Sequence, residues 1–364
     1  MKKYLKYIII ALALVIGYIG VDKVLDKLYL QQYKINSYTG DSRFTTVNKV
    51  VSKRFKKADT AILINTESID QVVSTSSYAY SKNMPVFYIE KERVLKDVYD
   101  QMEKLGVKKV VLVGGPNSIA PTVERSLKRN GYKFEKIIES PGINLSLKMA
   151  ELQNSEKKID SIAVVTGNEF DLPNAISFSP YAQNKNIPII VMSNREEDVV
   201  KLKEFINKYR IKKTYLIGNE GYFNTNIEKI LPEMEKVTGK DRYDVNIKII
   251  DKFFSDENNG KVYISKGGEI LHKRHIASGQ LINAMAISPL AADNNAPLMF
   301  INNNYFSSEE NEMIKSKSYK EINEVGFLIE RRNFFNVERF KVATTAFLIL
   351  ISVVMATRVL RTRR

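Results

Sequence analysis

The chain of 364 residues is long enough for two or three domains of ordinary size, and its 44% of hydrophobic residues can supply their cores. It contains no cysteine, which excludes disulfide bridges and thiolate metal sites. The net charge of +15 would favour a nucleic-acid partner, but about half of the excess lies in the two short terminal segments. The central region is only mildly basic, so we expect no nucleic-acid partner.

The first predicted element is an apolar helix near the N-terminus. Residues 7–21 carry no charge, and the longer segment 4–21 approaches the length of a membrane span if Lys6 reaches back to the headgroups. A cleaved export signal is the alternative, but no pair of small residues marks a cleavage site after the apolar stretch. We therefore expect an uncleaved transmembrane helix over 4–21, followed by an amphipathic stalk over 22–37.

Short buried strands alternate with amphipathic helices after the stalk. The segments 60–65, 85–89 and 107–115 are short apolar runs typical of buried strands. Between them, residues 72–82 and 94–105 have helical spacing of apolar residues. This alternation predicts right-handed βαβ units on a mostly parallel sheet, with helices on both faces.

A phrase at the end of the first predicted helix recurs twice, without gaps, further along the chain. The copies are TSSYAYSKNMPVFYI (75–89), FSPYAQNKNIPIIVM (178–192) and ISPLAADNNAPLMFI (287–301). Each carries alanine, asparagine and proline at the same places, followed by mainly apolar residues. An asparagine suits a helix exit and a proline can open a strand, so the phrase predicts a helix-to-strand corner used once per module.

Other motifs repeat with the same period of about 100 residues, which is the size of one small domain. TGDSRFTT (39–46) matches TGKDRYDV (238–245), and VKKVVLVGGPNSI (107–119) matches IKKTYLIGNEGYF (211–223). These repeats predict three tandem α/β modules, at residues 38–138, 139–237 and 238–340.

The last predicted element is a second apolar helix. Residues 342–357 carry no charge, and the segment 342–360 approaches a spanning length if Arg358 snorkels. A buried terminal helix is the alternative, but the segment is apolar all round and ends in a basic tail. Lys and Arg favour the cytoplasmic side of a membrane span. We therefore expect a plasma-membrane protein with both termini in the cytoplasm and residues 22–340 outside.

The order and threefold recurrence of these motifs resemble the type 2 cell-wall-binding repeat of Gram-positive surface proteins. The resemblance covers about Tyr38 to Phe340 and rests on the three corners and on four further motifs, GDSRFTT, TGKDRYDV, VLVGGPNSI and YLIGNEGYF. It implies three Rossmann-like modules with mostly parallel sheets, packed around a pseudo-threefold axis. It also implies non-covalent binding of an anionic secondary wall polysaccharide.

The sequence departs from the pattern of this family in each copy. Gln71, Asn174 and Asn283 stand where the family has the aspartate of a helix-opening DAL motif. The PILL run, which the family uses in wall attachment, corresponds here to Val86-Phe87-Tyr88, Ile189-Ile190-Val191 and Leu298-Met299-Phe300. Hydrophobic character is kept, so the module architecture is expected to persist while the specificity for one polymer is not fixed.

The candidate polymer-binding residues fall into three groups, each with a purely structural alternative. The acid and arginine pairs could bind an anionic sugar or could cap and connect helices. The paired glycines could offer backbone donors or form a tight turn. The strand triples could contact polymer or lie in the core. In these three groups the candidates are Asp41, Arg43, Asp241 and Arg242; Gly114 and Gly115; and Val86, Phe87, Tyr88, Leu298, Met299 and Phe300.

Sequence motifs for catalysis or cofactor binding are absent. His272 and His275 have helical spacing for a metal, but basic neighbours without a carboxylate favour a solvated loop. SEKK (155–158) fits the SxxK motif of some nucleophilic serines but lacks its partner motifs, and the GxSxG serine motif, a phosphate loop, a dinucleotide site and a zinc protease motif do not occur. We expect a binding protein that is not an enzyme and has no cofactor or metal. An envelope enzyme and an assembly scaffold for wall-polymer synthesis remain the alternatives.

Overall fold

The computed structural model describes residues 15–20, 33–254, 260–269, 278–329 and 342–348. The chain divides into two compact units. One combines both chain ends, Met1–Lys34 and Ile329–Arg364, and the other is Ile35–Leu328. In the first unit the described residues are chiefly two short helices, over 15–20 and 342–348.

The structure contradicts the predicted membrane localisation. The predicted spans 4–21 and 342–360 lie mostly outside the described residues, and the helices described there, six and seven residues long, rise only about 10 Å. A hydrocarbon core is about 30 Å thick. Among the residues that the structure describes, no helix is both long and apolar enough to cross a membrane. The localisation with residues 22–340 outside a plasma membrane is therefore wrong.

The described residues of the larger unit form three four-stranded sheets, two of which are continuous in sequence. The first contains, in spatial order, β3 (Val86–Ile89), β2 (Thr60–Asn65), β4 (Lys109–Gly114) and β5 (Lys133–Ile138). The second contains β7 (Ile189–Met192), β6 (Ser161–Thr166), β8 (Lys213–Asn219) and β9 (Met234–Gly239). All pairs in these two sheets are parallel, which confirms the predicted α/β modules.

The third sheet is completed by a strand from the other end of the chain. It contains β11 (Leu298–Ile301), β10 (Lys261–Lys266), β12 (Glu321–Glu324) and β1 (Lys34–Ser37). Here β1 takes the edge place that β5 and β9 hold in the other sheets. The predicted stalk 22–37 lies mostly outside the described residues, and its last four residues form this strand. The three modules are thus closed into a ring by the segment that precedes the first module.

Helices connect the strands and lie on both faces of the sheets. Those that lead between or within the modules are α2 (Arg43–Arg54), α3 (Ile69–Ser81), α4 (Lys96–Leu105), α5 (Pro121–Arg129), α6 (Ile143–Glu156), α7 (Leu172–Asn184), α8 (Glu196–Tyr209), α9 (Thr225–Glu228), α10 (Arg242–Phe253), α11 (Ser278–Asp293) and α12 (Ser308–Ser316). This is the helix cover that parallel crossovers require.

The repeated phrase forms the predicted helix-to-strand corner in all three modules. Its asparagines, at the ends of α3, α7 and α11, adopt the left-handed conformation, with φ of 49°, 60° and 46° for Asn83, Asn186 and Asn295. The residue after each asparagine donates its N–H to the alanine carbonyl of the phrase, at 2.8–3.0 Å. Asparagine tolerates this conformation better than most residues, so the sequence itself dictates this helix ending.

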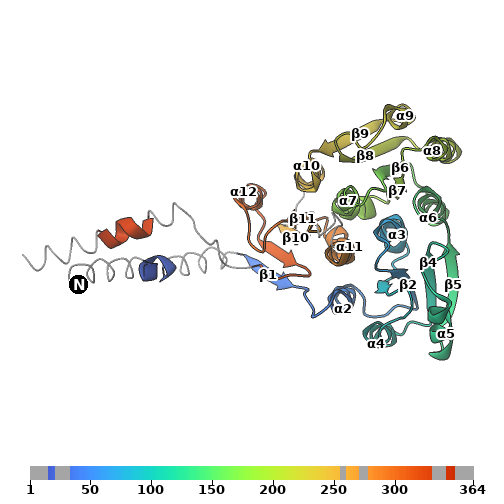
Figure 1. The fold of residues 1–364 in the computed structure, drawn as a ribbon, viewed down its shortest axis with the longest axis horizontal. Coiled ribbons are helices and arrows are strands. Elements are labelled where there is room, and N and C mark those ends of the chain that lie inside the picture. The colour runs from blue at the N-terminus through green and yellow to red at the C-terminus, as the bar shows by residue number, and fades with distance from the viewer. Residues whose placement is uncertain (1–14, 21–32, 255–259, 270–277, 330–341, 349–364) are drawn as a thin grey trace, which may run out of the picture. The chain divides into compact units, whose positions relative to one another are not determined.

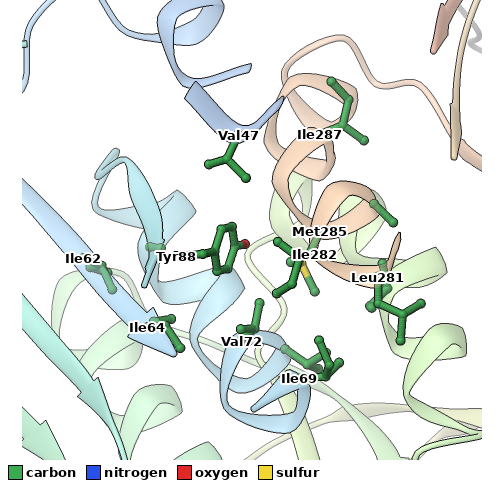
Figure 2. Packing of buried hydrophobic residues seen from close by; sticks show 14 of the residues in the cluster. Val47, Ile62, Ile64, Ile69, Val72, Tyr88, Leu281, Ile282, Met285 and Ile287 are labelled. Atoms are coloured by element: carbon green, nitrogen blue, oxygen red, sulfur yellow. The ribbon is translucent and has the colours of Figure 1, made fainter. Parts of the chain in front are cut away.

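The helices that follow the first strand of each module pack against one another at the centre of the ring. Figure 1 shows α3, α7 and α11 side by side, and α6, α10 and α2 each lie against one of them from the next module. Figure 2 shows one such junction, where Val47 of α2, Tyr88 of β3 and Met285 of α11 share one core. The ring therefore has a hydrophobic core that crosses the module boundaries.

Each module junction also carries a polar tie. Their partners and distances are Ser74 with Ser146 at 2.7 Å, Ser177 with Asn246 at 2.6 Å, and Arg54 with Asp293 at 2.8 Å. A net contribution of about 1 kcal/mol per hydrogen bond is small beside the hydrophobic burial, but leaving one partner unpaired costs more. These ties fix the orientation of neighbouring modules.

Candidate functional site

An open cleft of about 590 Å³ lies where the second module meets the first. The carboxyl ends of β6 and β7 form its floor, and the starts of α3 and α6 contribute further residues. Among its lining residues are Asp70, Gly142, Thr166, Asn168, Ser193, Asn194, Arg195, Asp198 and Tyr222. Ligands of parallel α/β sheets bind outside the carboxyl ends of the strands, so the fold favours this position for a site.

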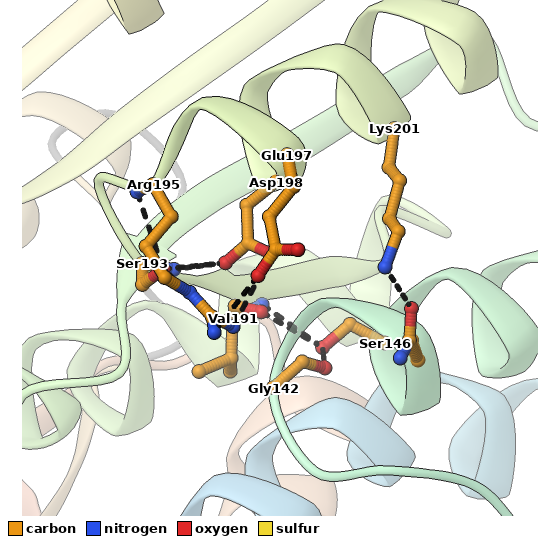
Figure 3. Close-up of polar contacts among 9 residues, drawn as sticks. Gly142, Ser146, Val191, Ser193, Arg195, Glu197, Asp198 and Lys201 are labelled. Carbon is orange, nitrogen blue, oxygen red and sulfur yellow. Dashed lines mark hydrogen bonds and ion pairs between the residues drawn. The ribbon is translucent and has the colours of Figure 1, made fainter.

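The loop between β7 and α8 holds a network of ionic groups at this cleft (Figure 3). Asp198 is only 2% exposed and accepts hydrogen bonds from the Ser193 N–H at 2.9 Å and from the Ser193 hydroxyl at 2.6 Å. The Arg195 Nε donates to Ser193 Oγ at 3.0 Å, and its Nη1 lies 2.8 Å from Glu197. The arginine side chain is 68% exposed, so its outer N–H groups can reach a ligand.

Ser146 connects the floor of the cleft to the neighbouring module. Its hydroxyl accepts the Val191 N–H at 3.0 Å and lies 2.9 Å from the Gly142 carbonyl (Figure 3). It also lies 2.7 Å from the Ser74 hydroxyl. It thereby joins α6, β7 and α3 at one buried point. The cleft is built on a rigid junction.

Asp70 faces the cleft from the first turn of α3. Burial raises its pKa, and backbone hydrogen bonds from Gln71, Asp70 itself and Gly142 oppose that shift. Gly142 has φ of +79°, a conformation that favours glycine, and it begins α6 in the next module. Gly142 therefore brings its backbone N–H to a carboxylate of the preceding module.

Asp171, which no sequence motif indicated, fills the switch point between β6 and β8. It is fully buried and accepts hydrogen bonds from Thr166 Oγ1 at 2.7 Å, from Asn174 Nδ2 at 2.8 Å and from the Asn219 N–H at 2.6 Å. A Cβ at Gly218 would lie 2.6 Å from its carboxylate, so only glycine fits there. Asn174 stands where the family has the aspartate of its DAL motif, and here a carboxylate three residues earlier, Asp171, lies at this point. This short spacing in the sequence could have suggested Asp171 as the substitute.

Gly114 and Gly115 lie at the corresponding place in the first module, where Gln71 fills the switch point. The Gly115 N–H donates to Gln71 Oε1 at 3.1 Å and to Ser118 Oγ at 2.9 Å. A Cβ at Gly114 would lie 2.9 Å from Gln71 Oε1. The Gly115 backbone donor is already used inside the protein, as the tight-turn alternative requires.

The acid and arginine pairs lie at helix starts. Asp241 caps α10, where its carboxylate accepts the Tyr243 and Asp244 N–H groups at 2.9 and 3.0 Å. In the first module Ser42 takes the cap position, and Asp41 is exposed in the preceding turn. The two pairs therefore differ in structure. The acid caps the helix in the third module, whereas a serine does so in the first module.

The two arginines stand at the first position of their helices. The Arg43 guanidinium lies 5.4 Å from the Phe44 ring, and that of Arg242 lies 5.0 Å from the Tyr243 ring. Both side chains are partly exposed. A role of either arginine in polymer binding stays a prediction.

The strand triples are in the core. Phe87, Tyr88, Leu298, Met299 and Phe300 are at most 3% exposed, and Val86 is partly buried beside them. Their position explains why hydrophobic character is kept while the letters vary, since the strands are covered on both faces. Their predicted contact with polymer stays a prediction.

The described residues include no group of three or more His, Cys, Asp or Glu that could hold a metal. His272 and His275 lie outside the described residues, so the structure does not test the expected solvated loop there.

Comparison with known families identifies the repeat. The family described as Cell wall binding domain 2 (CWB2) matches residues 38–124, 143–228 and 236–329. Each match covers most of one module of the ring. The chain belongs to this family and carries three tandem copies of its domain, as the resemblance of the motifs implied.

Two Bacillus subtilis proteins are similar to part of the chain. An N-acetylmuramoyl-L-alanine amidase, LytC, is 23% identical over 228 residues, which is 63% of this chain and 44% of the amidase. An amidase enhancer is 24% identical over 217 residues, which is 58% of this chain and 29% of the enhancer. The matched region therefore spans less than half the length of either relative.

Two solved structures from Clostridium difficile have the same fold. Cwp8 superposes with a TM-score of 0.71 and 24% identity, over 85% of this chain and 51% of Cwp8. Cwp6 superposes with a TM-score of 0.71 and 16% identity, over 82% of this chain and 46% of Cwp6. Identity this low supports the fold and nothing finer.

Proposed function

We propose that this protein binds a cell-wall polysaccharide without covalent bonds, and that the cleft between the first and second modules holds part of the glycan. Membership of the CWB2 family in three copies is the observation that carries this proposal. The chemistry of the cleft supports it, because hydroxyl, amide, carboxylate and guanidinium groups converge there and can all hydrogen-bond to sugar hydroxyls. A surface or wall-associated location follows from the same family.

The glycan is anionic in this proposal. The chain has 56 lysine and arginine residues against 41 acids, and about half of this excess lies between the two terminal segments, so a polyanion gains modestly from contact with the modules. Many weak contacts spread over three modules give a tight complex overall, because the second and third contacts form within one assembly. Such binding weakens as salt rises, since each ionic contact releases counterions.

The protein acts as a binder in this proposal, and the amidase activity of LytC is not carried over, because the match covers less than half of that protein. An enzyme acting on the same polymer is the second candidate. The two differ in one observable: a binder retains the polymer unchanged, while an enzyme alters its length or releases it from the wall.

Sedimentation of the full chain with purified walls tests the proposal. We expect the protein to pellet with walls that carry their anionic glycan, to stay in solution with walls stripped of it, and to be released between about 50 and 500 mM salt. Arg195→Ala in the cleft should weaken binding about tenfold, which corresponds to about 1.4 kcal/mol.

The matched control is Arg125→Ala, an exposed arginine on α5 far from the cleft lining. Equal pelleting with both kinds of wall would exclude the anionic glycan as ligand. Equal weakening by both arginine variants would exclude the cleft, since it would mean that only overall charge matters.

A further inference from the structure

A second open groove, of about 700 Å³, lies in the first module between α2 and α4. It is lined by lysines from both helices, by two aspartates and by short polar or aromatic side chains. The charged lining residues are Lys49, Lys53, Lys56, Lys104, Asp97 and Asp100. This lysine groove is separate from the cleft, and the two share no lining residue.

Three lysines form a row along one side of the lysine groove. Lys49 and Lys53 are four residues apart, which places them on one face of α2, and Lys56 stands just after Phe55, the extended residue that ends this helix. All three line the same groove. Lys104, near the end of α4, faces them across the groove.

Most of these charges are not used by the fold. The Lys49 amine donates to the Thr39 carbonyl. Lys53, Lys56 and Lys104 are exposed, and within the described part of the chain their amines have no hydrogen-bond or ion-pair partner. Of the two aspartates, Asp100 is already paired with Lys96 at 2.9 Å. The groove therefore keeps an uncompensated positive charge.

The other two modules neutralise the same place. In the second module, Lys208 near the end of α8 pairs with Glu151 of α6 at 2.9 Å. In the third module, Lys317 just after α12 pairs with Asp251 of α10 at 2.9 Å. In the first module, the α2 residues that line the groove opposite Lys104 include lysines and no acid. Repulsion between lysines that are held close together destabilises the folded state. A bound anion would reduce this repulsion.

The two helices that carry these charges are fixed to each other. Asn48 Nδ2 of α2 donates to the Asp97 carbonyl at the start of α4, at 2.8 Å. The lysines of α2 and Lys104 of α4 therefore keep their separation without a ligand. A preformed groove loses little entropy when it binds.

We propose that the lysine groove binds a stretch of anionic glycan that carries phosphate or carboxylate groups at intervals along its length. The proposal rests on the proposed function, and it adds an ionic binding site in the first module to the contacts that the cleft makes with the glycan. Four lysines spread along an open groove of about 700 Å³ suit successive charges of one polymer better than a single small anion.

The experiment compares two triple variants of the full chain in the wall sedimentation assay. K53Q/K56Q/K104Q removes the unused charges of the lysine groove and keeps side-chain length. K203Q/K212Q/K229Q removes the same charge from exposed positions of the second module and serves as control. We expect the groove variant to bind glycan-bearing walls at least about tenfold more weakly, with a clearly shallower salt dependence. The control should keep both the affinity and the salt dependence of the parent.

Several outcomes would overturn the proposal. If the parent protein pellets with the walls and the groove variant does so equally well with the same salt dependence, the lysine groove is excluded and the proposed function stands. If the parent protein does not pellet, the proposed function fails and the groove proposal fails with it. A melting temperature of each variant that is no lower than that of the parent confirms that charge and not loss of folding is compared.

Two further arms identify the anion. Soluble wall polymer fractions that carry only phosphate or only carboxylate groups are added as competitors, and the fraction that displaces the parent protein but not the groove variant supplies the ligand. Duplex DNA is the third probe. Loss of DNA binding in the groove variant with retained wall binding would overturn the proposal in favour of a nucleic-acid surface.

Discussion

At the scale of single residues, Asp171 shows how a buried carboxylate can hold several elements of a fold together. Burial raises its pKa, because the charged form loses hydration in the interior. Hydrogen bonds from Thr166, Asn219 and Asn174 oppose that shift. The carboxylate thus accepts several buried donors, each of which would otherwise be unpaired.

Asp171→Asn is expected to destabilise the protein by about 1–3 kcal/mol, because the amide offers one acceptor oxygen and presents an N–H₂ group to buried donors. The free energy of unfolding in urea measures the effect. Asp59→Asn, at an exposed position before β2, is the matched control and should change stability little. Equal stability of the two variants would contradict the role assigned to Asp171.

At the scale of elements, Glu235 of β9 connects two modules through an ionic contact. Its carboxylate lies 2.6 Å from Lys213 of β8 and 3.0 Å from Lys252 of α10. Burial works to raise the pKa of Glu235, but the hydrogen bonds from the two lysines outweigh it, and the pKa lies below the usual value. The contact therefore stabilises the folded protein when the carboxylate is charged.

Glu235→Gln should make stability less dependent on pH. A lowered folded-state pKa contributes stability that is complete above the usual glutamate pKa and is lost as the pH falls through the folded-state value. We expect the parent protein to exceed the variant in melting temperature near neutral pH and the difference to shrink toward about pH 3. A difference that is constant over this range would show that the contact is not ionic. Glu204→Gln, at an exposed position on α8, is the control.

At the scale of the whole molecule, the ring is closed by β1. Asn36 Nδ2 donates to Glu321 Oε1 at 3.1 Å and to Asn323 Oδ1 at 2.9 Å, and the Tyr38 N–H donates to the Glu324 carbonyl at 2.8 Å. Without β1, the edge of β12 would lose these partners. An uncovered strand edge is a template for pairing with other chains.

Asn36→Asp is expected to loosen this closure, because a carboxylate replaces the donor and faces the Glu321 carboxylate. A loss of about 1–3 kcal/mol should lower the melting temperature, and the amides of β12 should exchange hydrogen faster. Asn226→Asp, exposed at the start of α9, is the control. Unchanged exchange in β12 would show that the closure does not depend on this contact.

Membership in a repeat family and the module fold were predictable from the sequence because they rest on local patterns. Apolar runs and helical spacing define strands and helices within each module, and the alanine and asparagine of the repeated phrase define one corner. Asn83, Asn186 and Asn295 confirm this, since each takes the left-handed conformation that ends its helix. The predicted membrane localisation was wrong, since no helix among the described residues is both long and apolar enough to cross a membrane.

The sequence by itself determined the triplicated α/β modules, because strand and helix periods are written into neighbouring residues. Only the tertiary structure decided which strand completes the third sheet, since Asn36 and its partners are separated by 285 and 287 residues. The tertiary structure also decided which lysines pair with an acid and which face other lysines across a groove. It decided as well which polar side chain fills each switch point. Those pairings depend on distances between elements that no local pattern encodes.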